Sequence, residues 1–266
     1  MKVNILNYEP NRTGGGWTQA RYLHEGLDCV TYEEAEIVLI TGPTMASHDE
    51  LDKAKRDGKK IVFRLDNMPR HSNNKRNAGV NNTRDFSELA DLIIYQSEWA
   101  RNFLKPFIKK DGPVILNGVD TNVFNSNNRH PEEDSYLYVR SSRDDGKNWI
   151  GAWYWFVNNP GRLDIIGKFS PENQERNFDF YNGERINFQG MQIDMSPWYR
   201  RNKYFLYSYI SDACSNTLLE ARASGCEIID VFGALKTGGA PEIMACEDIS
   251  IERMVKEYEV EIGKLL

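Results

Sequence analysis

The stretch Ser211-Asp-Ala-Cys-Ser-Asn-Thr-Leu-Leu-Glu-Ala-Arg-Ala-Ser-Gly225 is the segment from which the fold is most readily inferred. Its first part, up to Asn216, has the composition of a polar loop, and the rest has that of a short helix. Asn216 is the predicted N-cap, because its side-chain oxygen can accept a hydrogen bond from a backbone amide of the first turn. Gly225 is the predicted end of the helix, because glycine readily adopts the left-handed conformation required there.

An apolar run from Cys226 to Phe232 follows this helix and is short enough to be a buried strand. A loop and a helix N-terminus beside such a strand present backbone amides and the positive end of a helix dipole to an anion. Asp212 and Glu220 add two carboxylates to this predicted anion site. Because carboxylates accept hydrogen bonds and repel anions, we interpret them as acceptors for the hydroxyl groups of a sugar or ribose attached to the anion.

The composition narrows the class of protein. A chain of 266 residues can form one large or two modest domains, and 40% hydrophobic with 27% charged residues is typical of a globular protein. A net charge of -6 argues against a nucleic-acid partner. The four cysteines lack the spacing of a metal site or a disulfide scaffold, which favours reduced thiols and a cytoplasmic location. No signal peptide is recognisable, and no apolar run approaches the roughly 20 residues of a transmembrane span.

Predicted strands and helices alternate along the chain. Strands are predicted at residues 3–6, 35–41, 60–65, 92–95, 113–116, 136–139, 163–166, 186–190, 204–207 and 226–232, with helices in between. Short connections between such elements predict parallel, doubly wound sheets, with a ligand at the carboxyl ends of the strands. The polar segment 125–134 is the predicted linker between two α/β units, and the aperiodic segment 66–83 is interpreted as a functional loop or a mobile one.

Three further loops carry binding chemistry. Gly14-Gly-Gly16 allows the backbone to come close to a ligand, or is simply a flexible turn. Arg143-Asp-Asp-Gly-Lys147 places two cations where they can hold a diphosphate, or forms a solvated turn whose charges cancel. The adjacent Asp144 and Asp145 alone are too few ligands for a metal site. Lys236-Thr-Gly-Gly-Ala-Pro-Glu242 is another glycine turn after a strand, and the order of all these loops along the chain favours a single site.

Together these motifs resemble those of the retaining GT-B glycosyltransferases of family 4 (glycosyl transferases group 1), in a short version. Asp212-x7-Glu220 is similar to the family's Glu-x7-Glu, with a first carboxylate that is one methylene shorter. Arg143…Lys147 is similar to its Gly-Arg…Lys-Gly loop, and Gly238-Gly-Ala-Pro-Glu-Ile243 to its Gly-Gly-x-Pro-Glu-Ile turn. Further similarities are Asn117-Gly-Val-Asp120 with Phe124, Asn187-Phe-Gln-Gly190 and Gly14-Gly-Gly16.

The resemblance implies a GT-B fold, in which two Rossmann-like domains face each other across a cleft and the C-terminal helix crosses back to the first domain. Residues 1–118 would form the acceptor-side domain, residues 119–247 the donor domain, and residues 248–266 the returning helix.

The resemblance also implies roles for individual residues. Arg143 and Lys147 would hold the donor diphosphate, and Glu220 would bind the ribose hydroxyls. Asp212 would face the transferred sugar, and Asp66 stands where the family often has a histidine, which makes it a candidate contact on the acceptor side. The remaining predicted donor contacts are Gly15, Gly16, Gln189, Gly190, Met191, Cys214, Ser215, Asn216 and Thr217.

The expected function is transfer of a hexose from a UDP- or GDP-linked sugar to a sugar-containing acceptor (a glycan, glycoprotein or glycolipid), with retention. No divalent metal is expected, because cations and helix amides would stabilise the departing diphosphate. The alternatives are a nucleotide-sugar epimerase or sugar phosphorylase of related fold, or a catalytically weak nucleotide-sugar-binding protein. Arg200-Arg-Asn-Lys203 is either an ordinary solvated face or a weak contact with a membrane surface.

Overall fold

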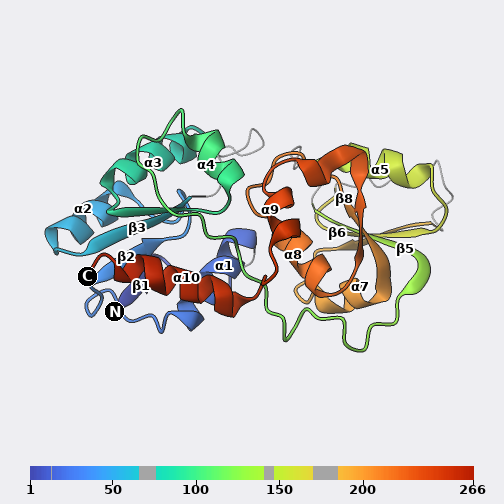
Figure 1. The fold of residues 1–266 in the computed structure, drawn as a ribbon, viewed down its shortest axis with the longest axis horizontal. Coiled ribbons are helices and arrows are strands. Elements are labelled where there is room, and N and C mark those ends of the chain that lie inside the picture. Colours follow the sequence, from blue (N-terminus) through green and yellow to red (C-terminus); the bar gives the residue numbers. More distant parts are fainter. Residues whose placement is uncertain (13, 66–75, 141–146, 170–184) are drawn as a thin grey trace. The chain divides into compact units, whose positions relative to one another are not determined.

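The chain forms two compact units, shown in Figure 1. A computed structural model describes residues 1–12, 14–65, 76–140, 147–169 and 185–266. The first unit comprises Met1–Gly118 together with Ala245–Leu266, and the second comprises Val119–Met244. The end of the chain therefore belongs to the same unit as its beginning. No helix in these described ranges is long and apolar enough to cross a membrane.

The first unit is built on a parallel sheet of four strands in the order β1-β2-β3-β4. The strands are β1 (Val3–Ile5), β2 (Ile37–Ile40), β3 (Lys60–Leu65) and β4 (Leu92–Tyr95). The helices are α1 (Gly15–Gly26), α2 (His48–Arg56), α3 (Arg76–Leu89), α4 (Glu98–Leu104) and α10 (Ile251–Gly263). The strand predicted at 113–116 forms only an isolated parallel bridge between Val114 and Tyr95.

Both faces of this sheet are covered by helices. Leu23 of α1 and Tyr258 of α10 pack in one core cluster with Val3 and Ile94 of the sheet. Residues of α2, α3 and α4 pack in a second cluster with the strand residues of opposite parity. Figure 1 shows α1 and α10 on one side of the sheet and α2, α3 and α4 on the other. The C-terminal helix thus completes the first unit.

Local sequence signals explain where several helices begin. Ser47 and Glu50 form the predicted capping box, in which each side chain accepts a hydrogen bond from the other residue's backbone amide. Ser97 and Ser250 cap α4 and α10 in the same way, through a side-chain oxygen bonded to the third helical amide.

The second unit is built on a parallel sheet of five strands in the order β7-β6-β5-β8-β9. The strands are β5 (Glu132–Val139), β6 (Arg162–Ile166), β7 (Ile186–Gly190), β8 (Asn202–Tyr207) and β9 (Glu227–Asp230). The helices are α5 (Trp149–Val157), α7 (Ser196–Arg201), α8 (Asn216–Ala223), the 3-10 segment η2 (Val231–Lys236) and α9 (Ala240–Ala245).

The strand order of this sheet identifies a ligand position. From β5 the chain first adds β6 and β7 on one side and then β8 and β9 on the other. Loops leaving β5 and β8 therefore diverge at the carboxyl edge, which is where open α/β sheets bind ligands. Two sequence predictions need correction here. β5 begins at Glu132, inside the polar segment predicted as a linker, and α7 was not predicted.

Candidate functional site

The candidate site lies at the carboxyl edge of the sheet in the second unit. Because all five strands are parallel, the loops after β5, β7, β8 and β9 leave from this one edge. Arg143, Asp144 and Asp145 lie outside the described residues, as does Asp66 of the first unit. The predicted site residues that the structure describes at this edge are Lys147, Gln189, Gly190, Met191, Asp212, Cys214, Ser215, Asn216, Thr217 and Glu220.

Two of the predicted residues form a direct ion pair. The Lys147 ammonium contacts Asp212 Oδ2, and the two side chains are only 3% and 14% exposed. The backbone carbonyl of Lys147 accepts hydrogen bonds from the Ser208 hydroxyl at 2.7 Å and the Tyr138 hydroxyl at 3.2 Å, which hold the lysine in place. Its Nζ also lies 4.5 Å from the centre of the Tyr209 ring. The ion pair and the aromatic ring thus hold the Lys147 side chain in a fixed position at this edge.

The loop of Asp212 is fixed by the glycine turn that the sequence singled out. The Gly239 amide donates to the Asp212 carbonyl at 2.9 Å. Gly238 has a φ of +58°, and a Cβ at this position would lie 2.5 Å from the Asp212 carbonyl oxygen. Only glycine meets both conditions without strain. The turn and the carboxylate loop, separated in sequence, therefore form one rigid corner of the site.

Helix α8 begins beside this corner. Its N-cap is Ser215, whose hydroxyl accepts a hydrogen bond from the Leu218 amide, so the prediction of Asn216 as N-cap was wrong by one residue. The Thr217 hydroxyl lies 3.1 Å from the Ser215 hydroxyl and 3.2 Å from that of Tyr209. Gly225 ends the segment with a φ of +75°, as predicted. The helix N-terminus is thereby fixed where its dipole can attract an anion.

Glu220 lies one turn further along α8 and has an unusual environment. Its Oε2 accepts a hydrogen bond of 2.8 Å from the hydroxyl of Tyr199, a fully buried residue of α7. Burial raises the pKa of Glu220 to about 7, against the opposing effects of the Tyr199 hydrogen bond and of the Arg140 charge. Burial and the neighbouring Glu220 raise the pKa of Tyr199 well above its usual value. A carboxyl group with this pKa can lose its proton near neutral pH and then accept hydrogen bonds from the hydroxyl groups of a ligand.

The residues at the end of β7 divide into two kinds. The Gln189 side-chain amide donates to Oδ1 of the buried Asp164 at 3.2 Å, so it supports the sheet. Met191 is 69% exposed at the same edge and has an apolar surface available to a ligand. Between them, the Gly190 carbonyl accepts a hydrogen bond from the Gly167 amide at 2.9 Å, which joins the ends of β6 and β7.

The first unit has a different polar centre at its own carboxyl edge. Gly15 and Gly16 are the first residues of α1, and Gly14 provides no side-chain cap for this helix. Arg64 of β3 is 2% exposed and donates to the Thr41 carbonyl at 3.0 Å and to Asn117 Oδ1 at 2.7 Å. Sequence reasoning missed Arg64 and Tyr199. Arg64 could have been noticed as a lone arginine in the apolar run 60–65. Tyr199 lies in a short helix, and no feature of the sequence distinguishes it.

Within the described ranges, no group of three or more His, Cys, Asp and Glu side chains is placed to hold a metal ion. The cysteines at 29, 214, 226 and 246 are all free thiols. The described part of the site thus includes the cations of Lys147 and Arg140, two carboxylates, hydroxyl groups and a helix N-terminus.

Comparisons with known proteins identify the fold. No protein-family model and no curated protein matches the sequence. Sucrose-phosphate synthase from Thermosynechococcus elongatus superposes with a TM-score of 0.74 at 12% identity, covering 99% of this chain and 98% of that one. HepE from Anabaena, in complex with UDP and glucose, gives 0.68 at 12% identity, covering 98% and 95%. The pneumococcal O-GlcNAc transferase GtfA, in complex with UDP and GlcNAc, gives 0.56 at 13% identity, covering 94% and 52%.

These similar structures are GT-B glycosyltransferases, and the match runs through nearly the whole chain. The predicted GT-B fold with Rossmann-like sheets is therefore confirmed.

Proposed function

We propose that the protein is a glycosyltransferase that moves a hexose from a nucleotide diphosphate sugar to a sugar-containing acceptor, with retention. One observation carries the proposal: Lys147 and Asp212 meet at the carboxyl edge beside the N-terminus of α8, which also bears Glu220. The GT-B fold supports it, and so do the UDP, glucose and GlcNAc bound in the complexes of HepE and GtfA. A uridine nucleotide is the donor that we propose first.

The donor would be held by groups of matching chemistry. The diphosphate would meet the Lys147 ammonium, the backbone amides of residues 214–217 and the dipole of α8. Arg143 joins this group by the sequence resemblance. The ribose hydroxyls would donate to Glu220, whose ionised form they would stabilise. Met191 would contact the base through its exposed apolar surface.

The transfer would proceed at the front face of the donor sugar. The bond between the anomeric carbon and the diphosphate oxygen breaks, a bond to the acceptor oxygen forms, and the acceptor proton passes to the departing phosphate. Lys147 and the helix amides would stabilise the negative charge that develops on that phosphate, so we propose that no divalent metal is required. Asp212 would orient Lys147 and face the positive charge that develops at the anomeric carbon. Asp66 stays a candidate contact on the acceptor side.

The first experiment is a thermal-shift screen with UDP, GDP and their sugars, followed by measurement of nucleotide release with and without mono- and oligosaccharide acceptors. Acceptor-dependent release of UDP would support transfer. Conversion of the donor without release would instead indicate an epimerase, and binding with neither would indicate a nucleotide-sugar-binding protein.

Site-directed variants test the assignment of the site. Lys147→Met should lower turnover roughly 100-fold or more, because one preorganised electrostatic contact to the leaving group is lost. Lys203→Met is the matched control, since that lysine pairs with the exposed Glu133 at 2.7 Å, away from the carboxyl edge. Equal activity of the two variants would disprove the proposed role of Lys147.

A further inference from the structure

The first unit carries an exposed aromatic and basic surface that the proposed transfer reaction does not use. It consists of α4 and the turn after it, and we name it the α4 surface. Its members are Trp99, Phe103, Lys105, Phe107 and Lys109. The inward side of the same segment packs in the core through Ala100, Leu104 and Ile108, which are buried.

The aromatic members form a continuous apolar ridge. Trp99 and Phe103 are one helical turn apart, and their rings stack with centroids 5.1 Å apart and planes 12° from parallel. Phe103 is 43% exposed, and Phe107, four residues further on, is 55% exposed. Large apolar side chains gathered at one place on a surface mark an interaction site.

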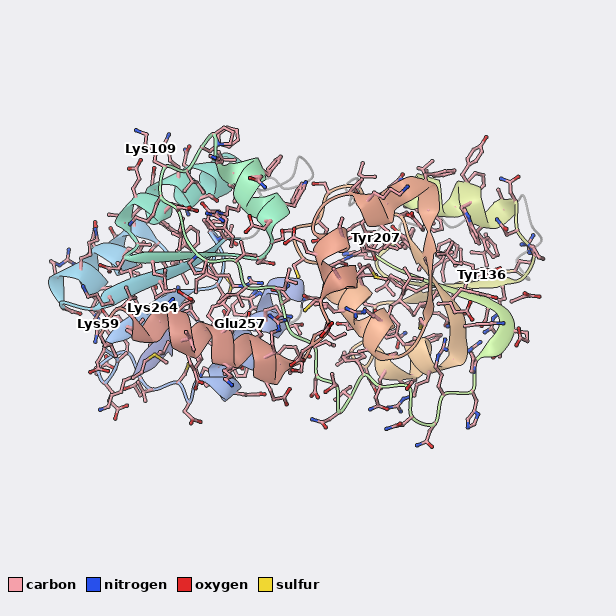
Figure 2. The ribbon with its side chains drawn as sticks, viewed as in Figure 1. Lys59, Lys109, Tyr136, Tyr207, Glu257 and Lys264 are labelled. Carbon is pink, nitrogen blue, oxygen red and sulfur yellow. The ribbon has the colours of Figure 1, made fainter. Side chains whose placement is uncertain are left out.

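The charges around this ridge are positive and available. Lys105 and Lys109 are exposed, and neither forms an ion pair with any described residue. The two carboxylates of the segment, Glu98 and Asp111, both pair with Arg101, and the charge of Lys105 also acts on Asp111 without a direct contact. Residues 98–111 contain four Lys or Arg and two Asp or Glu, a net charge of +2 in a chain of net charge -6. Figure 2 shows Lys109 at the outer surface of the first unit.

A cavity of about 350 Å³ adjoins the ridge. It lies between α3 and the turn, and its lining includes Arg84, Phe107, Lys109 and Lys110, with Glu88 as its acidic member. A hollow with cationic and apolar walls suits an anionic headgroup attached to an acyl chain.

The basic cluster singled out in the sequence behaves differently. Arg200 donates to the Val123 carbonyl at 3.2 Å. Arg201 lies 3.3 Å from Glu132, and Lys203 lies 2.7 Å from Glu133. Arg201 and Lys203 are therefore paired with carboxylates of the second unit, whereas Lys105 and Lys109 of the α4 surface form no ion pair with a described residue.

We propose that the α4 surface docks the protein on a membrane containing anionic lipids. Phe103, Phe107 and Trp99 would enter the interfacial layer, and Lys105 and Lys109 would contact phosphate groups, as in peripheral proteins that combine aromatic and basic side chains. A nucleic acid fits less well, because stacking buries one face of each of the two rings and so leaves fewer faces for bases. The proposal does not depend on the transfer reaction, so either can fail alone.

Vesicle sedimentation tests this proposal with the full chain. The protein should partition onto vesicles of phosphatidylglycerol and phosphatidylcholine in equal parts, and not onto phosphatidylcholine alone. Lys105→Glu with Lys109→Glu should lower partitioning at least roughly 20-fold, since each lysine contributes roughly fivefold. Phe103→Ser with Phe107→Ser should abolish it.

The matched control is Ile150→Ser with Tyr154→Ser, which removes two residues that are 67% and 58% exposed on α5 of the second unit. This variant should partition like the unmodified protein. Circular dichroism checks that every variant is folded. The proposal is overturned if the unmodified protein does not bind anionic vesicles or if the α4 variants bind them equally well. It is also overturned if Phe103→Ser with Phe107→Ser leaves vesicle binding intact and instead abolishes a homodimer or binding to single-stranded oligonucleotides.

Discussion

The two units of this protein share a parallel sheet flanked by helices, yet their carboxyl edges differ in how charge is held. In the first unit, Arg64 is bonded to two neutral oxygens, of Thr41 and Asn117. In the second, Lys147 is bonded to a carboxylate, and a second carboxylate, Glu220, is partly buried on α8. A cation held by neutral acceptors stabilises a scaffold. A cation paired with a carboxylate among partly buried acids can respond to a ligand, which is why we place the chemistry in the second unit.

The largest effect is expected in the first unit. Met254 and Ile262 of α10 are buried in the core of the first unit. Met254→Ala or Ile262→Ala should therefore lower the free energy of unfolding by about 2–5 kcal/mol. Val260→Ala is the control, because this residue of the same helix is 55% exposed. Chemical denaturation measures the change. If the second unit lost as much stability as the first, the division into two units would be wrong.

Loss of the ion pair of the second unit should have an effect of similar size. Lys147→Ala leaves Asp212 largely buried without its partner and should lower the free energy of unfolding by about 3–5 kcal/mol. The double variant Lys147→Met with Asp212→Asn should regain much of that stability without regaining activity. A double-mutant cycle separates the two effects. Recovery of activity in the double variant would show that the pair is only structural.

Glu220 should make the stability of the second unit depend on pH near neutrality. Its folded pKa of about 7 exceeds the ordinary 4.5, so the folded state binds more protons between these values. Stability contributed by the protonated form is complete below pH 4.5 and is lost as pH rises through 7. The difference amounts to about 3 kcal/mol at most. Unfolding of Glu220→Gln, compared with the unmodified protein from pH 4 to 8, should remove this slope.

The same carboxyl group predicts a pH dependence of donor binding. Ribose hydroxyls stabilise the ionised form, so the affinity for UDP should rise as pH increases through about 7. Glu220→Gln should bind UDP more weakly and with a flat profile, which calorimetry would show. An unchanged profile in this variant would remove Glu220 from the donor site.

The smallest expected effect concerns the glycine turn. In Gly238→Ala the added Cβ would lie 2.5 Å from the Asp212 carbonyl oxygen, at a position with positive φ. The substitution should lower the free energy of unfolding by about 1–3 kcal/mol and also lower turnover. Gly263→Ala, whose added Cβ meets nothing within 4 Å, should leave both quantities nearly unchanged. Equal turnover in the two variants would separate the turn from the proposed chemistry.

The alternation of strands and helices, and with it the fold, followed from local sequence patterns. The capping box at Ser47 and the helix end at Gly225 were confirmed because each depends on neighbouring residues only. Ser215 and Asn216 are both good N-caps by type, and only the backbone path decided between them. The strand at 113–116 failed because a single residue finds a partner on β4.

The candidate site was harder to predict because its decisive contacts are distant in sequence. The sequence placed Lys147 and Asp212 in separate loops, but their pairing depends on the adjacency of β5 and β8. Tyr199 reaches Glu220 from a helix of six residues that lacks a clear hydrophobic period. Both contacts require the strand order, which local patterns do not encode.

The return of α10 to the first unit also sets an order of events during synthesis. Residues 245–266 leave the ribosome after every residue of the second unit. Until then, the sheet face formed by Val3, Ile37 and Ile94 lacks the cover that Tyr258 and Ile262 provide. The second unit, continuous in sequence, can fold during translation, whereas the first must wait until α10 has emerged. A nascent chain paused before Ser250 would thus have a finished second unit and an exposed apolar face in the first, a natural binding site for a chaperone.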